Sequence, residues 1–406
     1  MKQISFSRFN IDQKLFWFIF LGLGFFVLLG LFCAHYMESE GHHITGMNNQ
    51  IMWGLPHIFA VFMIIVSSGV LNIASLSSVF DREMYKPLAP LSGLIALSFL
   101  IAGLLILVLD LGRPDRLIVA MTTYNFKSIF AWNIFLYTGF AVVLAGYIWT
   151  MLDYEVKKYS KPVGIFAFTW RIILTTGTGS IFGFLVAREA YATAILAPLF
   201  IVMSLLYGVV VYYLLLVIIN KLHKTIIEPE VIENLKKLTV MFLFANLYFL
   251  FLYHLTNMYI SKHLEFEIFI LFNGGVYTTA FWLGQVLIGI ILPLIFLLTN
   301  KICSYFSLLI SSLFILFGSF MSMFVIIIAG QAYPLTIFPD HTIVESSFYD
   351  NVIHSYVPSI YELGLGIGGT ALALIIVLIG LANLKFLPKN NSVKNNNKNL
   401  ETSSVD

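Results

Sequence analysis

Cysteine and charge are both scarce in this sequence. The 406 residues include two cysteines, Cys33 and Cys303, and neither belongs to a CxxC or CxxCH motif. We therefore expect no bound haem, metal or iron–sulfur cluster in the chain. Charged residues make up 11% of the chain, the net charge is +2, and no basic block lies between the apolar runs. This composition argues against a nucleic-acid partner.

Apolar residues dominate the rest of the sequence. They account for 59% of the chain, and the mean hydropathy is +0.90, which is more apolar surface than a water-soluble protein can bury. Because a spanning helix needs about 20 apolar residues, we predict an all-α polytopic integral membrane protein. Ten runs of this size lie near 15–36, 55–79, 88–111, 128–151, 163–187, 191–219, 238–260, 276–299, 304–330 and 360–384. The first run has no small-residue cleavage site after it, so we expect an anchor that stays in the protein.

Lysine and arginine are unevenly divided between the two sides of the membrane. With the N-terminus inside, the outer segments hold five of the 23 Lys and Arg residues: Arg113, Arg116, Lys127, Arg188 and Lys262. The positive-inside rule then places both termini in the cytoplasm, as expected for a multi-pass protein of the bacterial cytoplasmic (inner) membrane. We divide the chain into a cytoplasmic N-terminal tail (1–14), a membrane domain (15–388) and a cytoplasmic tail (389–406) that is expected to be disordered.

The stretch VLDLGRPDR, residues 108–116, places four charged residues at the outer end of the third run. Pro114 disfavours helical geometry at Arg113, so the helix should end near Gly112. Asp110 then lies in the last helical turn, where its charged form is disfavoured unless Arg113 or Arg116 compensates. A carboxyl group poised between two protonation states suits a proton acceptor. An interfacial Asp–Arg cluster that only holds the loop in place is an equal alternative.

The stretch GHHITGMNNQIMWGLPH, residues 41–57, leads into the second run from the same side. If this stretch is helical throughout, Asn49, Trp53 and His57 share one face. Pro56 argues against that, because proline suits the first turn of a helix better than its interior. His57 would then lie near a helix N-terminus, which favours a neutral imidazole that can hydrogen-bond a carbonyl or hydroxyl group.

Ionisable groups near or inside the spans are costly and are therefore functional candidates. The candidates for a proton path are Arg171, Arg188, Glu189, His254 and Glu362. Two simpler interpretations stay open: Arg171 can snorkel to the inner surface, and Arg188 with Glu189 can form a short loop. The outer loop from about 331 to 358 is either a docking surface for a partner or a simple covering loop.

Three motifs resemble the NrfD/PsrC family of membrane subunits, which exchange electrons between the quinone pool and an iron–sulfur partner. They are LDLGRPDR at 109–116, NNQIMWGLPHIFAVFMIIVSSG at 48–69, and YVPSIYE before the last run. The ten runs and the C-terminal pattern are most similar to the branch that contains DsrP, HybB and the membrane subunits of alternative complex III. The resemblance covers residues 15–388 and implies two four-helix bundles, spans 2–5 and 6–9, flanked by the first and last spans.

The resemblance also implies a quinone pocket near the outer face, with no cofactor held by the chain itself. Carried over motif by motif, the quinone-binding residues are Asn49, Trp53, His57, Asp110, Arg113 and Arg116. Asp110 and His57 are the candidate catalytic groups, and menaquinone or ubiquinone is the expected substrate. The expected partner is an iron–sulfur (ferredoxin-like) subunit at the outer face, with a cytochrome c or molybdopterin subunit as a further candidate.

Three functions stay open on the sequence alone. The first is a quinone/quinol-interacting membrane subunit of a respiratory redox complex, not catalytic alone, with proton release or translocation as an added role. The second is an ion- or proton-translocating, transporter-like subunit, which the lack of paired broken helices at the midplane disfavours. The third is a passive membrane anchor. We favour the first, because such a chain need only bind and deprotonate a quinol.

Overall fold

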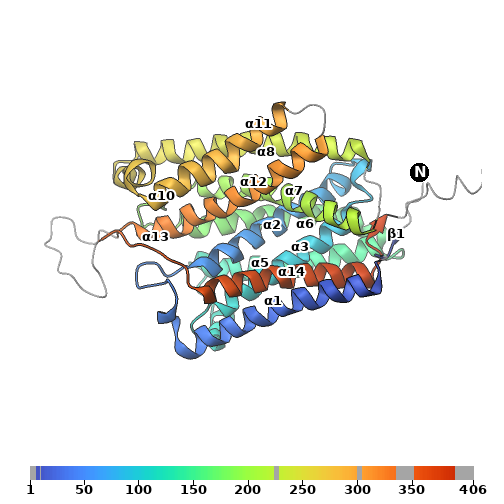
Figure 1. The fold of residues 1–406 in the computed structure, drawn as a ribbon, viewed down its shortest axis with the longest axis horizontal. Coiled ribbons are helices and arrows are strands. Elements are labelled where there is room, and N and C mark those ends of the chain that lie inside the picture. The colour runs from blue at the N-terminus through green and yellow to red at the C-terminus, as the bar shows by residue number, and fades with distance from the viewer. Residues whose placement is uncertain (1–5, 10, 224–227, 300–303, 335–351, 389–406) are drawn as a thin grey trace, which may run out of the picture.

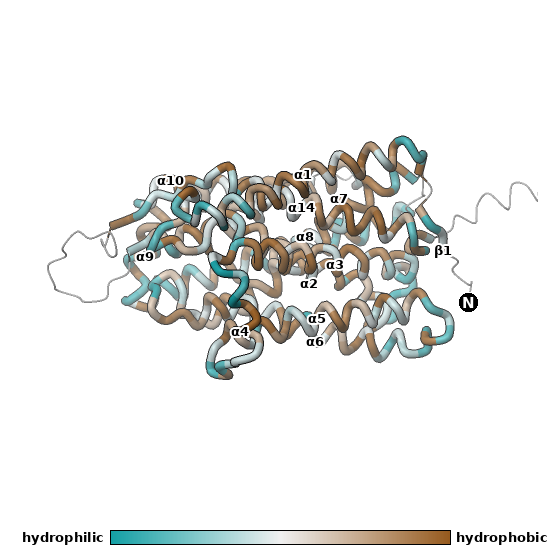
Figure 2. The backbone as a smooth tube through the Cα atoms, turned by 90° about the horizontal axis from the view of Figure 1, so that it is seen from below, coloured by the Kyte–Doolittle hydropathy of each residue, from teal (hydrophilic) through white to brown (hydrophobic). Residues whose placement is uncertain are grey.

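The structure is almost entirely helical. The computed structural model describes residues 6–9, 11–223, 228–299, 304–334 and 352–388. Within these ranges ten helices are long and apolar enough to cross a membrane, which confirms the predicted all-α polytopic membrane protein. The helices run alongside one another (Figure 1), with apolar residues along their middles and hydrophilic residues gathered at both ends (Figure 2).

Four helices close into a first bundle, the one expected from spans 2–5. α2 packs on α3, α3 on α5, α5 on α6, and α6 back on α2. The bounds of these helices are Leu55–Ser78 (α2), Ala89–Leu109 (α3), Ile129–Leu152 (α5) and Ser160–Gly183 (α6). Short elements connect them: η2 (Glu83–Tyr85), η3 (Pro114–Arg116), α4 (Leu117–Thr122) and η4 (Lys157–Tyr159).

The second bundle corresponds to spans 6–9, and two of its spans contain π-helical segments. The other two are α-helical throughout: α7 (Leu196–His223) and α8 (Pro229–Tyr259). The third is built from α10 (Val276–Thr279), η7 (Ala280–Ile291) and α11 (Leu292–Thr299). The fourth is built from α12 (Ser304–Phe324), η8 (Val325–Ala329) and α13 (Gly330–Ala332). Between the second and third spans lie η5 (Ser261–His263), α9 (Leu264–Ile268) and η6 (Phe269–Asn273).

α2 and α7 join the two bundles. Gly69 and Gly208 face each other where these helices cross, and a Cβ on Gly208 would fall on the backbone of Gly69. A Cβ on Gly69 would fall in turn on the carbonyl group of Ser204. Small residues allow membrane helices this close approach. The crossing places α2 in the interior of the molecule.

Gly208→Val should therefore destabilise the protein strongly. Overpacking a well-packed interior costs about 1–3 kcal/mol or more, and here the added atoms meet backbone that cannot rotate away. The measurement is the thermal unfolding temperature of the purified chain in detergent. Gly146→Val on α5 is the matched control, since nothing lies within 4 Å of a Cβ at Gly146. Equal unfolding temperatures for the two variants would contradict the close crossing.

The first and last spans flank the bundles and bring the chain ends together. α1 (Gln13–Glu40) packs along α14 (Ile360–Asn383), which also contacts α3 and α2. β1 (Phe6–Ser7) pairs antiparallel with β2 (Leu387–Pro388), at the end of the molecule where the N-terminus is marked in Figure 1. We call this the terminus end. The opposite end, formed by 41–54, 110–128, 184–195, 260–275 and 352–359, is the site end; η1 (His42–Ile44) belongs to it.

Some boundaries differ from those expected. α6 ends at Gly183 and α7 begins at Leu196, so the connection that holds Arg188 and Glu189 is longer than the gap expected between the runs 163–187 and 191–219. α8 already begins at Pro229 and continues through the charged residues that precede the seventh apolar run. The tail at 389–406, most of the outer loop (335–351) and Cys303 lie outside the described residues.

Candidate functional site

An aromatic pair marks the start of α2. The helix begins with Pro56 in its first turn, as the proline predicts. Asn49 lies in the loop before the helix and is exposed, so it does not share a helical face with Trp53 and His57. The rings of Trp53 and His57 are stacked, with centroids 5.2 Å apart and an interplanar angle of 8°, and Phe182 makes a T-shaped contact with Trp53. Trp53 and His57 are both half-buried.

Gln331, at the end of the second bundle, holds the backbone that precedes α2. Its Oε1 accepts hydrogen bonds from the N–H groups of Met52 and Trp53, both at 3.0 Å. Its Nε2 donates to the carbonyl oxygens of Trp53 (3.1 Å) and Ile327 (2.8 Å). The second bundle therefore positions the aromatic pair of the first. Sequence reasoning missed Gln331, whose one signal is a polar side chain directly after an apolar run.

Asp110 lies at the end of α3, beside the first turn of α2. α2 and α3 run antiparallel and touch at Gly103, where a Cβ would meet Met63 and the carbonyl oxygen of Ala60. Asp110 lies about two helical turns further along α3, which brings it to the level of the first turn of α2. Oδ1 of Asp110 is buried and has no hydrogen-bond partner among the described residues. Burial, and after it the charge of Glu362, raises the pKa of Asp110 to about 8. The direction of this shift is the one expected for a carboxyl group at the end of a helix, and the role of Asp110 as a proton acceptor stays a prediction.

The two arginines that follow Asp110 do not neutralise it. Arg113 and Arg116 are exposed, and the ion pairs found in the described part of the chain include none of these three residues. His42 approaches the segment instead, with its Nε2 3.1 Å from the backbone carbonyl oxygen of Asp110. Among the described residues, the Asp110 carboxyl group therefore has no cationic partner.

Glu362 is fully buried at the start of α14 and ties three segments of the site end together. Its Oε1 accepts a hydrogen bond from the Tyr356 hydroxyl group (2.6 Å), and its Oε2 accepts from the N–H groups of Ser359 (2.6 Å) and Gly46 (2.9 Å). The Tyr356 oxygen in turn accepts from the N–H group of Leu55 in the first turn of α2 (2.6 Å). The carboxylate thus links α14, the loop before α2, and α2 itself.

A family comparison decides what kind of chain carries this site. Residues 43–334, more than half of the chain, match the family described as "Polysulphide reductase, NrfD". The chain belongs to the NrfD polysulphide reductase family. The matched segment contains Trp53, His57, Asp110 and Gln331, and it ends before Glu362.

Two curated relatives align along nearly the whole NrfD-family chain, and a third aligns along part of it. The Hdr-like menaquinol oxidoreductase integral membrane subunit of Archaeoglobus fulgidus is 27% identical over 390 residues, which is 95% of this chain and 97% of the relative. A selenate reductase subunit of Mesobacillus selenatarsenatis is 22% identical over 416 residues, covering 92% and 95%. The menaquinone reductase integral membrane subunit of Nitratidesulfovibrio vulgaris is 24% identical over 176 residues, covering 43% and 41%.

In this NrfD-family chain, Arg188 fastens the connection between the bundles to the site. Its Nη1 donates to the carbonyl oxygen of Gln331 (3.0 Å) and its Nη2 to that of Gln50 (2.7 Å). Burial lowers the pKa of Arg188. For the neighbouring Glu189, burial, and after it the charge of Glu265, raises the pKa of the carboxyl group. Arg188 therefore holds loops in place.

The remaining candidates for a proton path lie elsewhere. Arg171 is 2% exposed inside the first bundle, where its Nη2 donates to Oδ1 of Asn72 (2.9 Å) and its guanidinium group lies 4.7 Å from the centre of the Phe168 ring. It does not snorkel to the surface. His254 lies in the second bundle, against Glu267. The structure thus brings Arg188, Glu189 and Glu362 to the site end, places Arg171 inside the first bundle, and places His254 in the second bundle near its site end.

Proposed function

We propose that this chain is the quinol-reactive membrane subunit of a redox complex, with a menaquinone-type quinone as its substrate. The observation that carries the proposal is that Oδ1 of Asp110 is buried and has no hydrogen-bond partner among the described residues, at the end of α3 near the first turn of α2, where Trp53 and His57 are stacked. The menaquinol and menaquinone activities named for two of the relatives support the choice of quinone.

The chemistry requires a proton acceptor at the quinol. Oxidation of a quinol to a quinone releases two electrons and two protons, and an acceptor is most effective when its pKa lies near the working pH. Asp110, with a pKa of about 8, meets this condition. We assign the first proton to Oδ1 of Asp110 and a hydrogen bond with the second quinol oxygen to His57. Trp53 offers an aromatic face to the quinone ring, and Asn49, Arg113 and Arg116 remain candidate contacts on the exposed side.

The proposed electron acceptor is an iron–sulfur subunit docked on the site end. The segments of the site end carry five of the 23 Lys and Arg residues. By the positive-inside rule we assign the site end to the outer side of the membrane and the terminus end to the cytoplasmic side. Such a carrier takes the two electrons one at a time, while the protons leave through Asp110. The second bundle and α14 support the site through Gln331 and Glu362.

Binding of a menaquinol-analogue inhibitor tests the proposal. The full chain in lipid nanodiscs should bind the inhibitor, and His57→Leu should weaken binding about tenfold, the worth of one hydrogen bond. The measurement is isothermal titration calorimetry. His35→Leu, at an exposed position on α1, is the matched control and should bind as the wild type does. A wild-type chain that does not bind the inhibitor would support the passive anchor instead.

A further inference from the structure

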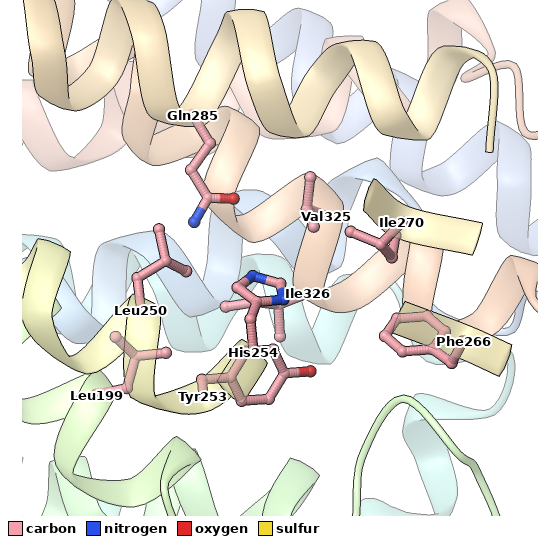
Figure 3. A pocket seen from close by; sticks show the side chains of 9 residues that line it. All are labelled: Leu199, Leu250, Tyr253, His254, Phe266, Ile270, Gln285, Val325 and Ile326. Atoms are coloured by element: carbon pink, nitrogen blue, oxygen red, sulfur yellow. The ribbon is translucent and has the colours of Figure 1, made fainter. Parts of the chain in front are cut away.

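A second polar site lies in the second bundle, near its site end. A small pocket of about 10 Å³ lies there, which is room for about one water molecule. Most of its wall is apolar, but His254 and Gln285 point into it from opposite sides (Figure 3). Both side chains come from spanning helices of the second bundle and neither belongs to the candidate quinol site.

Three π-helical segments meet at this cavity. Gln285 belongs to η7, Ile270 to η6, and Val325 with Ile326 to η8, and all four residues line the space. π-Helical turns are rare, and they are found frequently at functional sites. Their convergence on one cavity argues for a built site and against a packing defect.

The polar groups around the cavity are unevenly satisfied. Gln285 is 2% exposed, and its Oε1 has no hydrogen-bond partner among the described residues. His254 is well paired on one side, where its Nδ1 lies 2.7 Å from Oε2 of the fully buried Glu267. Asn257 Nδ2 donates to the other oxygen of that carboxylate at 2.8 Å. An unpaired buried acceptor is costly, so a ligand that donates to Gln285 is expected.

The hydrogen-bonding capacity of these groups identifies the ligand. An ionised Glu267 can only accept, so Nδ1 of His254 carries the hydrogen that faces it. Nε2 of the neutral ring is then an acceptor, as is Oε1 of Gln285. A water molecule has two hydrogens and can donate to both atoms, and one water molecule is what the cavity holds.

We propose that His254, Glu267 and Gln285 form a buried proton-binding site with one bound water. When that water arrives as hydronium, Nε2 of His254 takes its extra proton. The resulting imidazolium is balanced by the Glu267 carboxylate, and the water that remains accepts from Nε2–H and donates to Gln285. This site neither requires nor contributes to the proposed quinol chemistry. His254 lies near the site end of α8, the second helix of the second bundle. Asp110 has the corresponding place in the first bundle, at the end of its second helix, α3.

The other charged and titratable groups near the pair lie toward the site end. They are Tyr253 on α8, Lys262 and His263 on η5, Glu265 on α9, and Glu189 and Tyr191 in the connection between the bundles. From α7, η7 and η8 the cavity receives apolar side chains and Gln285. Oδ1 of Asn257 lies 3.2 Å from Nδ1 of His263, so the polar contacts of the pair extend toward the surface of the site end.

Infrared pH-difference spectra of the full chain in lipid nanodiscs, without quinol, test the proposal. The wild type should show a histidine that protonates reversibly as the pH is lowered, and His254→Phe should remove that signal. Gln285→Met keeps the volume but removes the acceptor, and it should lower the midpoint by at least about one pH unit, a tenfold loss of proton affinity. Ser312→Ala removes another buried, unpartnered oxygen outside the cavity and should leave the midpoint unchanged.

The outcomes separate this site from a purely structural ion pair. Absence of a His254-dependent signal overturns the proposal, and so does a midpoint that Gln285→Met leaves unchanged. If His254→Phe does not fold, the comparison of Gln285→Met with Ser312→Ala still tests the proposal. Because no quinol is present, failure of the proposed quinol function would not alter these spectra.

Discussion

Asp110→Asn should reduce quinol-linked turnover at least about a hundredfold while the complex stays assembled. The amide keeps the shape of the side chain but cannot accept the quinol proton, and general acid–base catalysis contributes about 10²–10⁴ in rate. The measurement is quinol:acceptor turnover of the purified complex, with its assembly checked by size-exclusion chromatography. Asp115→Asn, at an exposed position of the same stretch, should keep wild-type turnover. Normal turnover of Asp110→Asn would remove Asp110 from the mechanism.

The same substitution should change how stability depends on pH. The pKa of Asp110 is raised from 3.8 to about 8, mainly by burial, so between these values the folded chain binds more protons than the unfolded chain. The free energy of unfolding of the wild type should therefore fall as the pH rises from about 4 to about 8. Asp110→Asn lacks this titration. As the pH rises from about 4 to about 8, its unfolding temperature should therefore rise relative to that of the wild type. A constant difference would contradict the raised pKa.

Glu362→Leu should cause the largest loss of stability at the site end. It leaves three donors without an acceptor, namely the buried Tyr356 hydroxyl group and the partly buried N–H groups of Ser359 and Gly46. An unpaired buried donor costs about 1–3 kcal/mol, and the lost bond from Ser359 is also one half of the capping box that begins α14. We expect a much lower thermal unfolding temperature, together with loss of quinol turnover as the loop before α2 detaches.

A graded series makes the role of Glu362 testable even if the leucine variant does not fold. Glu362→Gln keeps one acceptor oxygen, so its unfolding temperature should lie between those of the wild type and Glu362→Leu. Tyr356→Phe removes the hydroxyl bridge to Leu55 alone and should also be intermediate. Glu265→Gln, at an exposed position on α9, serves as the control. A glutamine variant as stable as the wild type would show that the carboxylate is not needed.

Local rules of the sequence predict the helices and the position of Asp110. An apolar run of about 20 residues forms a helix in lipid, because a helix satisfies its own backbone hydrogen bonds. Pro56 marks the first turn of α2, and Gly112 with Pro114 marks the end of α3. Asp110 could therefore be placed at a helix end, and its raised pKa follows from that place.

The contacts that complete the site could not be predicted, because the partners lie far apart in the sequence. Gln331 and Trp53 are 278 positions apart, and Glu362 and Gly46 are 316 apart. Nothing local distinguishes these polar side chains from others at the ends of apolar runs. The same holds for Arg171: its length allows snorkelling, and the packing of α6 against Asn72 of α2 keeps it buried. The π-helical segments have the composition of ordinary spanning helices.

The burial of α2 has a consequence for how the protein is made. In its most apolar window 94% of α2 is buried, against 6% for α1, so α2 meets protein and not lipid in the finished molecule. A segment leaving the translocon must still be apolar enough to partition into the bilayer on its own. The hydrophobicity of α2 therefore serves its insertion, and its final surroundings form later, when α7 emerges and Gly208 reaches Gly69. A chain arrested before α7 would leave this face of α2 in contact with acyl chains.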